Sequence, residues 1–156
     1  MTPSVRSDPL YSNLFEIFRG FKAMVTDAVA VYDLSMSHFA ALRILDSHGS
    51  CSMSELTNDL GVTHGAATGT IDRLERDGLV LRSHSPTDRR VVQVSLTPAG
   101  QQLLIKVYER TVAEIGRRVQ ERSEEARSVI IQGVAELAAA FRTHQAPAQP
   151  KDTVCR

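Results

Sequence analysis

A glycine at position 61 separates two short helix-forming segments, and this arrangement constrains the fold more than any other feature of the chain. The first segment begins at Ser52, which together with Glu55 makes the Ser-x-x-Glu pattern of a capping box. Thr63 can cap the second segment, and Gly78 can end it. Because two helices that meet across a tight glycine turn are typical of a helix-turn-helix, we predict that motif here.

The region after Gly78 changes to the two-residue period of a β-strand. We predict strands over residues 79–83 and 91–96. The polar segment between them contains turn-forming residues, among them Pro86 and Asp88. The pattern therefore predicts a β-hairpin, the candidate wing, with a basic exposed tip.

Long amphipathic segments flank this central region on both sides. Apolar residues recur every three or four positions over residues 10–32, which predicts a long helix. Ser35 is a good N-cap for a further helix that Gly49 would stop. Past the hairpin, Thr97 and the proline after it begin a helix, and Ser123 begins another with an acidic first turn. The fold class expected is therefore mainly α with a small β-hairpin wing.

Charge and hydropathy restrict the possible partners and location. The chain has 18 basic and 18 acidic residues, so its net charge gives no sign of a polyanionic partner. Over residues 62–94 five arginines face four carboxylates, five minus four or a net of plus one, which is a weak electrostatic signal. No apolar run approaches the roughly 20 residues that cross a bilayer, and we expect no membrane contact and a cytoplasmic location.

Patterns that would indicate catalysis or metal binding are missing from the sequence. It has no nucleophile elbow, phosphate loop or paired carboxylates at catalytic spacing, so we expect neither an enzyme nor a cofactor. His48 and Cys51 have a spacing that metal sites use, but no second pair accompanies them, and we expect no metal. Cys51 is expected to be a buried structural thiol and Cys155 to be incidental.

Several motifs together resemble the multiple-antibiotic-resistance regulator (MarR) family. The resemblance extends from the start of the second helix to the start of the helix after the wing. It is carried by Leu34-Ser35, Gly49, Ser54-Glu55-Leu56, Leu60-Gly61-Val62-Thr63, residues 72–80, residues 86–90 and Leu96-Thr97-Pro98-Ala99-Gly100.

This resemblance implies a homodimeric transcription regulator that binds double-stranded DNA, with a repressor released from a palindromic operator by a small-molecule effector as the expected form. Together with the residue patterns, it leads us to expect a flexible N-terminus (1–9), an N-terminal dimerisation helix (10–33), a DNA-binding lobe (34–97), C-terminal dimerisation helices (98–143) and a flexible tail (144–156) whose composition includes Pro and Gln. The residues expected at the dimer interface are Leu14, Phe18, Val134, Leu137 and Phe141, and those expected in an effector pocket are Phe21, Met24 and Tyr32. Because aromatic residues at helical spacing also suit a core or a dimer interface, those roles stay open for the pocket residues.

The resemblance also implies how DNA would be read. The start of the second helix of the motif would enter the major groove, Arg90 would reach the minor groove, and Asp88 would hold the wing in shape. For Arg73, ion pairing on its own helix is an equally weighted alternative to DNA contact. The residues expected to contact DNA are His64, Gly65, Thr68, Gly69, Arg73, Arg89 and Arg90.

Two glycines in the expected recognition helix depart from what a helix favours, since each costs about 1 kcal/mol relative to alanine. Either the backbone approaches DNA closely at Gly65 and Gly69, or His64, Thr68, the wing and DNA shape carry the recognition.

Two other functions stay open. A thiol-based oxidant sensor would act through Cys51. A winged-helix module that binds protein would fit the nearly neutral lobe.

Overall fold

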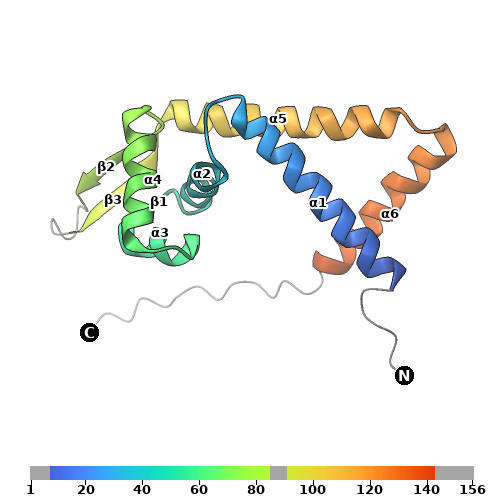
Figure 1. Cartoon of the computed structure of the whole chain (residues 1–156), viewed down its shortest axis with the longest axis horizontal. Helices are drawn as coiled ribbons and strands as arrows, with labels where there is room; N and C mark the ends of the chain where they lie inside the picture. Colours follow the sequence, from blue (N-terminus) through green and yellow to red (C-terminus); the bar gives the residue numbers. More distant parts are fainter. Residues whose placement is uncertain (1–7, 85–90, 143–156) are drawn as a thin grey trace, which may run out of the picture. The chain divides into compact units, whose positions relative to one another are not determined.

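The computed structural model describes residues 8–84 and 91–142, and Figure 1 follows the chain through them. The chain divides into two compact units, residues 1–113 and 114–156. The wing-tip residues Asp88, Arg89 and Arg90, the tail over 144–156 and residues 1–7 lie outside the described part. The elements are α1 (Pro9–Ala30), α2 (Met36–His48), β1 (Ser50–Ser52), α3 (Met53–Leu60), α4 (His64–Arg76), β2 (Val80–His84), β3 (Val92–Leu96), α5 (Pro98–Gln120) and α6 (Glu124–Arg142).

The expected helix-turn-helix is confirmed by its caps. In α3 the Ser52 amide donates to Glu55 Oε2 at 2.8 Å, and the Glu55 amide donates to Ser52 Oγ at 3.3 Å, which completes the capping box. Gly61 ends the helix in the left-handed region with φ 63°. Thr63 Oγ1 then accepts from the Ala66 amide at 3.3 Å and starts α4. Local chemistry thus places both helices of the motif.

The first helix begins slightly earlier than its apolar pattern indicates. Asp8 caps α1, because its Oδ1 accepts from the Leu10 amide at 2.7 Å, and Pro9 occupies the first helical position. The helix ends at Ala30, and the turn that follows holds Asp33 at φ 55°. A left-handed conformation is uncommon for a residue other than glycine, and aspartate is one of the residue types that adopt it most readily.

The sheet has three strands, whereas the sequence predicted a two-stranded hairpin. Its order is β1-β3-β2 with antiparallel pairing, so β3 lies between the other two strands. β2 and β3 lie within one residue of their expected bounds, and Cys51 of β1 pairs with Val94 of β3. β1 was missed because three residues between two helix signals are too few to show a strand period.

The first unit packs its helices and sheet around one hydrophobic core. α1 contributes only its C-terminal half, through Val25, Ala28 and Val29. The largest fully buried side chains are Leu42, Leu45, Leu56, Ile71, Leu74, Leu104, Val29, Val94 and Val107.

A close backbone contact fixes the start of α5 in this unit. Thr97 Oγ1 donates to the Gly78 carbonyl at 2.7 Å and accepts from the Gly100 amide at 3.1 Å. A Cβ atom at Gly100 would lie 2.1 Å from the Leu79 carbonyl oxygen, so only glycine fits there. The turn after α4 and the start of α5 are therefore joined rigidly.

The second unit contains the last turns of α5 and all of α6. Ser123 caps α6 by accepting from the Ala126 amide at 3.3 Å, and Glu124 and Glu125 provide the expected acidic first turn. α6 has no buried residue. None of the helices in the described ranges is both long and apolar enough to cross a membrane.

Candidate functional site

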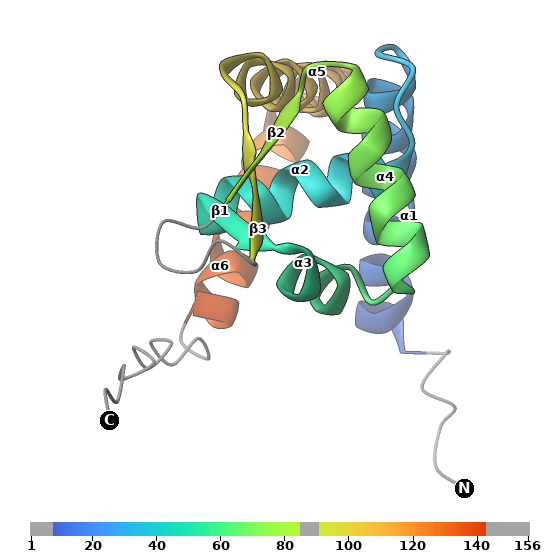
Figure 2. The ribbon, with the colours of Figure 1, turned by 90° about the vertical axis from the view of Figure 1, so that its left-hand side faces the viewer.

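Helix α4 presents one face to the core and the opposite face outward. Ala67, Ile71 and Leu74 are fully buried. Because a helix turns about 100° per residue, the opposite direction is that of Gly65 and Gly69. Both glycines are exposed, and α4 lies at the surface of the first unit (Figure 2). The core thus anchors the helix while its outer face stays accessible.

The first two turns of α4, residues 64–71, contain no Asp, Glu, Lys or Arg. His64 is exposed and Thr68 is half-buried, and both lie on one side of the outer face. Backbone amides at a helix N-terminus carry partial positive charge and favour anions such as phosphate. The expected reading end of α4 is therefore an uncharged surface with an intrinsic preference for negative charge.

Nothing inside the described chain requires glycine at positions 65 and 69. Neither residue has a positive φ angle. A Cβ atom at either one would meet no atom within 4 Å. Both sequence-based explanations, close approach of DNA to the backbone and recognition by neighbouring residues, therefore remain predictions.

Arg73 lies in the ion-paired state that the sequence left open as an alternative. Its Nε donates to Asp77 Oδ2 at 2.7 Å and its Nη2 donates to Asp33 Oδ2 at 2.9 Å. The hydrogen bond to Asp77 raises the pKa of Arg73 above its usual value. DNA contact by Arg73 remains a prediction, and it would require these bonds to be exchanged.

Arg82 makes a second two-carboxylate arrangement, which the sequence did not predict. Its Nη2 donates to Asp72 Oδ1 at 2.7 Å and its Nη1 to Glu75 Oε2 at 2.5 Å. The bonds join β2 to α4. No local pattern signals them, because the partners belong to different elements.

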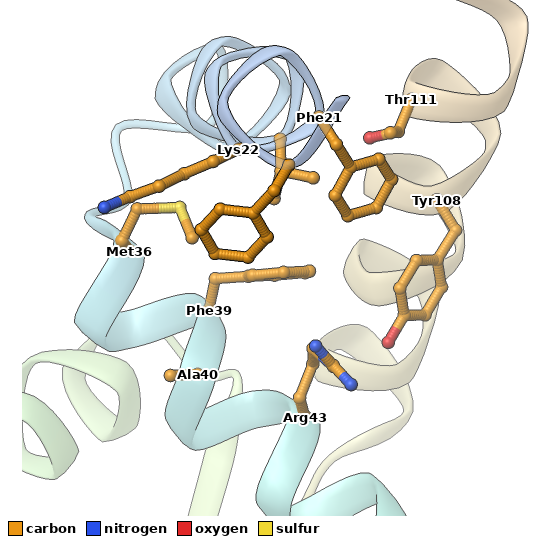
Figure 3. A pocket seen from close by; sticks show the side chains of 10 residues that line it. Phe21, Lys22, Met36, Phe39, Ala40, Arg43, Tyr108 and Thr111 are labelled. Atoms are coloured by element: carbon orange, nitrogen blue, oxygen red, sulfur yellow. The ribbon is translucent and has the colours of Figure 1, made fainter. Parts of the chain in front are cut away.

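A cavity of about 310 Å³ opens beside α1, α2 and the middle of α5, within the first unit (Figure 3). Of the expected effector residues, Phe21 lines it. Met24 and Tyr32 are half-buried and do not belong to its lining. The side chains that line it are Phe18, Phe21, Lys22, Val25, Met36, Phe39, Ala40, Arg43, Tyr108 and Thr111.

The cavity combines aromatic walls with cationic groups. Phe39 and Tyr108 make an edge-to-face contact with ring centroids 6.1 Å apart. The Arg43 guanidinium lies near the Tyr108 hydroxyl, whereas the Lys22 ammonium points away from the rings (Figure 3). In the described ranges neither Lys22 nor Arg43 forms an ion pair, and the lining contains no carboxylate. This arrangement suits a ring-bearing ligand with an anionic group.

Cys51 lies in the core. Its side chain is 2% exposed, and burial raises the pKa of the thiol to about 11. His48 Nδ1 lies 3.5 Å from Asp59 Oδ2. Within the described part of the chain no three metal-binding side chains gather at one place.

The expected dimer residues belong to two elements. On α1, Phe18 is 65% exposed and Leu14 is half-buried. On α6, Val134 and Phe141 are exposed and Leu137 is half-buried. Each helix therefore carries large apolar side chains that its own unit leaves uncovered.

Comparison with known sequences identifies related regulators. The model of the MarR family matches residues 34–92, which contain α2 to α4, β1, β2 and the first residue of β3. YfiV of Bacillus subtilis (strain 168), named an uncharacterized HTH-type transcriptional regulator, is 33% identical over 109 residues, which are 70% of this chain and 68% of YfiV.

Solved structures share the fold. The transcriptional regulator Tm0710 from Thermotoga maritima is 27% identical with a TM-score of 0.79, over 86% of this chain and 95% of that one. A mutant of MepR from S. aureus, solved with a bound oligodeoxyribonucleotide, is 20% identical with a TM-score of 0.70, over 84% of this chain and 97% of that one. These matches show that the chain shares its fold with both proteins.

Proposed function

The chain belongs to the MarR family of transcription regulators, and from that premise we propose that it is a homodimeric repressor that binds a palindromic operator and is released by a small-molecule effector. The winged helix-turn-helix of the first unit binds the DNA. The dimer forms through the apolar faces of α1 and α6. No catalytic step is part of this proposal.

The observation that carries the proposal is the outer face of α4. The N-terminal half of this helix is uncharged and begins at the Thr63 cap. The fully buried side chains of Ala67, Ile71 and Leu74 anchor the helix to the core. Recognition helices of this motif place such an N-terminal half in the major groove, where side chains reach base edges. His64 and Thr68 are the proposed readers, and Gly65 and Gly69 are the proposed sites of close backbone approach.

The direct test is fluorescence-anisotropy titration of the full chain against two labelled duplexes at several salt concentrations. One duplex covers the DNA upstream of its own gene, and the other is a scrambled duplex of equal composition. We expect salt-sensitive binding that prefers the upstream duplex, with two protomers per site. Equal binding to both duplexes would contradict an operator in that region, and absence of binding to any DNA would contradict the regulator function.

The wing contributes through Arg89 and Arg90 in this proposal, although both lie outside the described residues. Replacing Arg90 with alanine should weaken binding to all duplexes and lower the salt slope by about 0.9 per lost phosphate contact. An unchanged salt slope would remove the wing from the mechanism.

Two-fold symmetry follows from the proposed dimer. Two recognition helices about 34 Å apart would reach half-sites one helical turn apart on one face of the duplex. Bound across a promoter, such a dimer would block transcription. The bound oligodeoxyribonucleotide of the S. aureus MepR mutant supports DNA as the partner of this fold.

The cavity beside α1, α2 and α5 is the proposed effector site. The proposed dimer can place its two lobes at different spacings, and only one spacing fits the operator. A ligand that binds the other spacing more tightly would lower DNA affinity, by the ratio of its affinities for the two spacings. A thermal-shift screen of small aromatic carboxylic acids tests this, because a ligand at 100 times its Kd adds about 2.7 kcal/mol of stability. A hit should lower DNA affinity, and replacement of Arg43 with glutamine should abolish the shift.

The oxidant-sensor alternative finds little support in the surroundings of Cys51. Sensor thiols are exposed and have a lowered pKa, whereas this thiol is buried and its pKa is about 11. We therefore expect Cys51→Ser to keep wild-type DNA binding, with and without peroxide. The anisotropy titrations at several salt concentrations distinguish the protein-binding alternative from DNA binding, because only DNA binding gives a salt-sensitive affinity for the duplexes.

A further inference from the structure

We propose that Arg82 is a positioning residue of the DNA-binding surface, which holds Asp72 and Glu75 of the recognition helix and cancels their negative charge as the helix approaches phosphate. This inference rests on the proposed function, since it concerns the repulsion between carboxylates of the lobe and the phosphates of bound DNA. Arg82 itself contacts no base or phosphate in this proposal.

The contacts of Arg82 use both ends of its planar fork. One terminal nitrogen lies 2.7 Å from Asp72 Oδ1 and the other 2.5 Å from Glu75 Oε2. The Arg82 side chain is 25% exposed, compared with 58% for Arg117, which pairs with Glu114 of α5 and with Glu121 just past the end of that helix. Both arginines bind two carboxylates, and the lower exposure of Arg82 fixes its guanidinium more firmly than that of Arg117.

The strand that carries Arg82 is itself held by the core. Arg82 shares one face of β2 with Val80, whose side chain is 2% exposed. In the sheet, Arg82 pairs with Val94, which is fully buried. The guanidinium therefore extends to α4 from a rigid support, and it can fix the distance between the strand leading to the wing and the recognition helix.

The two carboxylates lie where their charge matters for DNA. Asp72 lies one turn beyond Thr68 and two turns beyond His64, toward the same side of α4. Glu75 follows on that side by helical spacing. Both are thus close to the surface proposed to meet the sugar-phosphate backbone, where unpaired negative charge is repelled.

No other cationic side chain in the described ranges forms an ion pair with these two carboxylates. Arg73, their neighbour on α4, binds Asp77 and Asp33 instead. Asp72 and Glu75 have ion pairs with Arg82 alone in the described part of the chain. Without Arg82 the C-terminal half of α4 would present two uncompensated negative charges, and the lobe has little excess positive charge to offset them.

The test compares Arg82→Gln, the double variant Asp72→Asn/Glu75→Gln, and the triple variant that combines them. Arg118→Gln is the matched control, because it also removes one arginine from an ion pair, on α5. Anisotropy titrations use the upstream and scrambled duplexes, and circular dichroism melting reports folding. We expect R82Q to weaken binding to both duplexes about tenfold, while the triple variant recovers to within about threefold of wild type.

The rescue separates charge cancellation from direct contact. If Arg82 gripped phosphate, Arg82→Gln would cost as much affinity in the Asp72→Asn/Glu75→Gln background as in the wild type. A triple variant that is about tenfold weaker than the double variant would therefore overturn the proposal. Wild-type affinity of R82Q would overturn it equally. Arg82→Lys keeps the charge but not the two-point geometry, so an intermediate loss is expected, and this variant keeps the test decisive if R82Q does not fold.

Failure of this inference is distinguishable from failure of the proposed function. A wild-type chain that binds no DNA contradicts the proposed function before any variant is compared. A wild-type chain that binds the upstream duplex, together with an unimpaired R82Q, contradicts only the role of Arg82.

Discussion

The lobe around α4 and the terminal helix α6 differ in how much apolar surface they cover. In the lobe, Leu42, Leu56 and Ile71 have no exposed surface. In α6 no residue is buried, and Val129 and Phe141 are 69% and 63% exposed. Both segments are amphipathic in sequence, so amphipathicity alone does not tell which surface covers a helix.

The difference shows which part of the molecule buries its apolar surface within one chain and which part does not. The first unit, which contains the lobe, closes a core from five helices, α1 to α5, and a sheet, so its fold depends on contacts within one chain. The apolar face of α6 needs a surface from elsewhere, and the proposed homodimer would supply it. Substitutions in the lobe should therefore lower folding stability, whereas substitutions on α6 should weaken assembly.

The largest effect is expected in the lobe core. Replacing Leu74 with alanine removes a fully buried side chain from α4 and should lower the free energy of unfolding by about 2–5 kcal/mol. Urea denaturation followed by circular dichroism measures this. A loss below about 0.5 kcal/mol, the size of a surface effect, would contradict the packing described for this helix.

A charge on α6 should break assembly and leave the lobe folded. Val134→Glu places an unpaired carboxylate in the proposed interface, and we expect the dimer to weaken by about a hundredfold or more. Analytical ultracentrifugation measures the association. Gln132→Glu, which adds the same charge to an exposed polar position of α6, is the control and should stay dimeric. An unchanged dimer in Val134→Glu would place the interface elsewhere.

The outer face of α4 is uncovered like that of α6, but its proposed partner is DNA. Alanine at Gly65 and Gly69 should each raise stability by up to about 1 kcal/mol and lower DNA affinity. Gly116→Ala in α5 is the control, since a Cβ atom there also meets nothing within 4 Å. It should give a similar stability gain with unchanged DNA binding. Wild-type affinity of both α4 variants would show that DNA does not approach the backbone there.

The smallest effect concerns pH and the start of α2. Burial and the nearby Arg73 charge lower the pKa of His38 below 6.5, while Asp77 and Asp33 act in the opposite direction. The neutral ring accepts the Ser35 amide at Nδ1, 3.0 Å away.

Because the unfolded chain takes up the proton more readily, stability should be complete above about pH 6.5 and decline as pH falls through the lowered pKa. Urea melts of wild type and His38→Asn between neutral and mildly acidic pH measure the difference. Asparagine keeps an acceptor for the cap without titrating in this range. An equal decline in both proteins would assign the pH dependence to other groups.

Local chemistry made much of the lobe predictable. The Ser52 and Glu55 capping box and the Thr63 cap act over three or four residues, and the structure confirms them. The strands of the hairpin followed from a two-residue period, with bounds correct to one residue. The family followed from the order of these motifs, and the comparisons confirm it.

The candidate site was predictable only where its parts are local. The capped start of α4 and its outward residues could be placed from helical spacing. The cavity could not, because its lining comes from three helices that the fold brings together, and of the three residues expected there only Phe21 lines it. Aromatic spacing on one helix cannot say which face will meet another helix.

By itself, then, the sequence determined the helices, their caps, the hairpin and the family, because these depend on interactions between residues a few positions apart. Only the tertiary structure decided that β1 joins the sheet, that Arg73 reaches Asp33 across 40 residues, and that Arg82 holds two carboxylates of α4. Such pairings depend on how the chain packs its core, and packing brings together side chains that no local pattern connects.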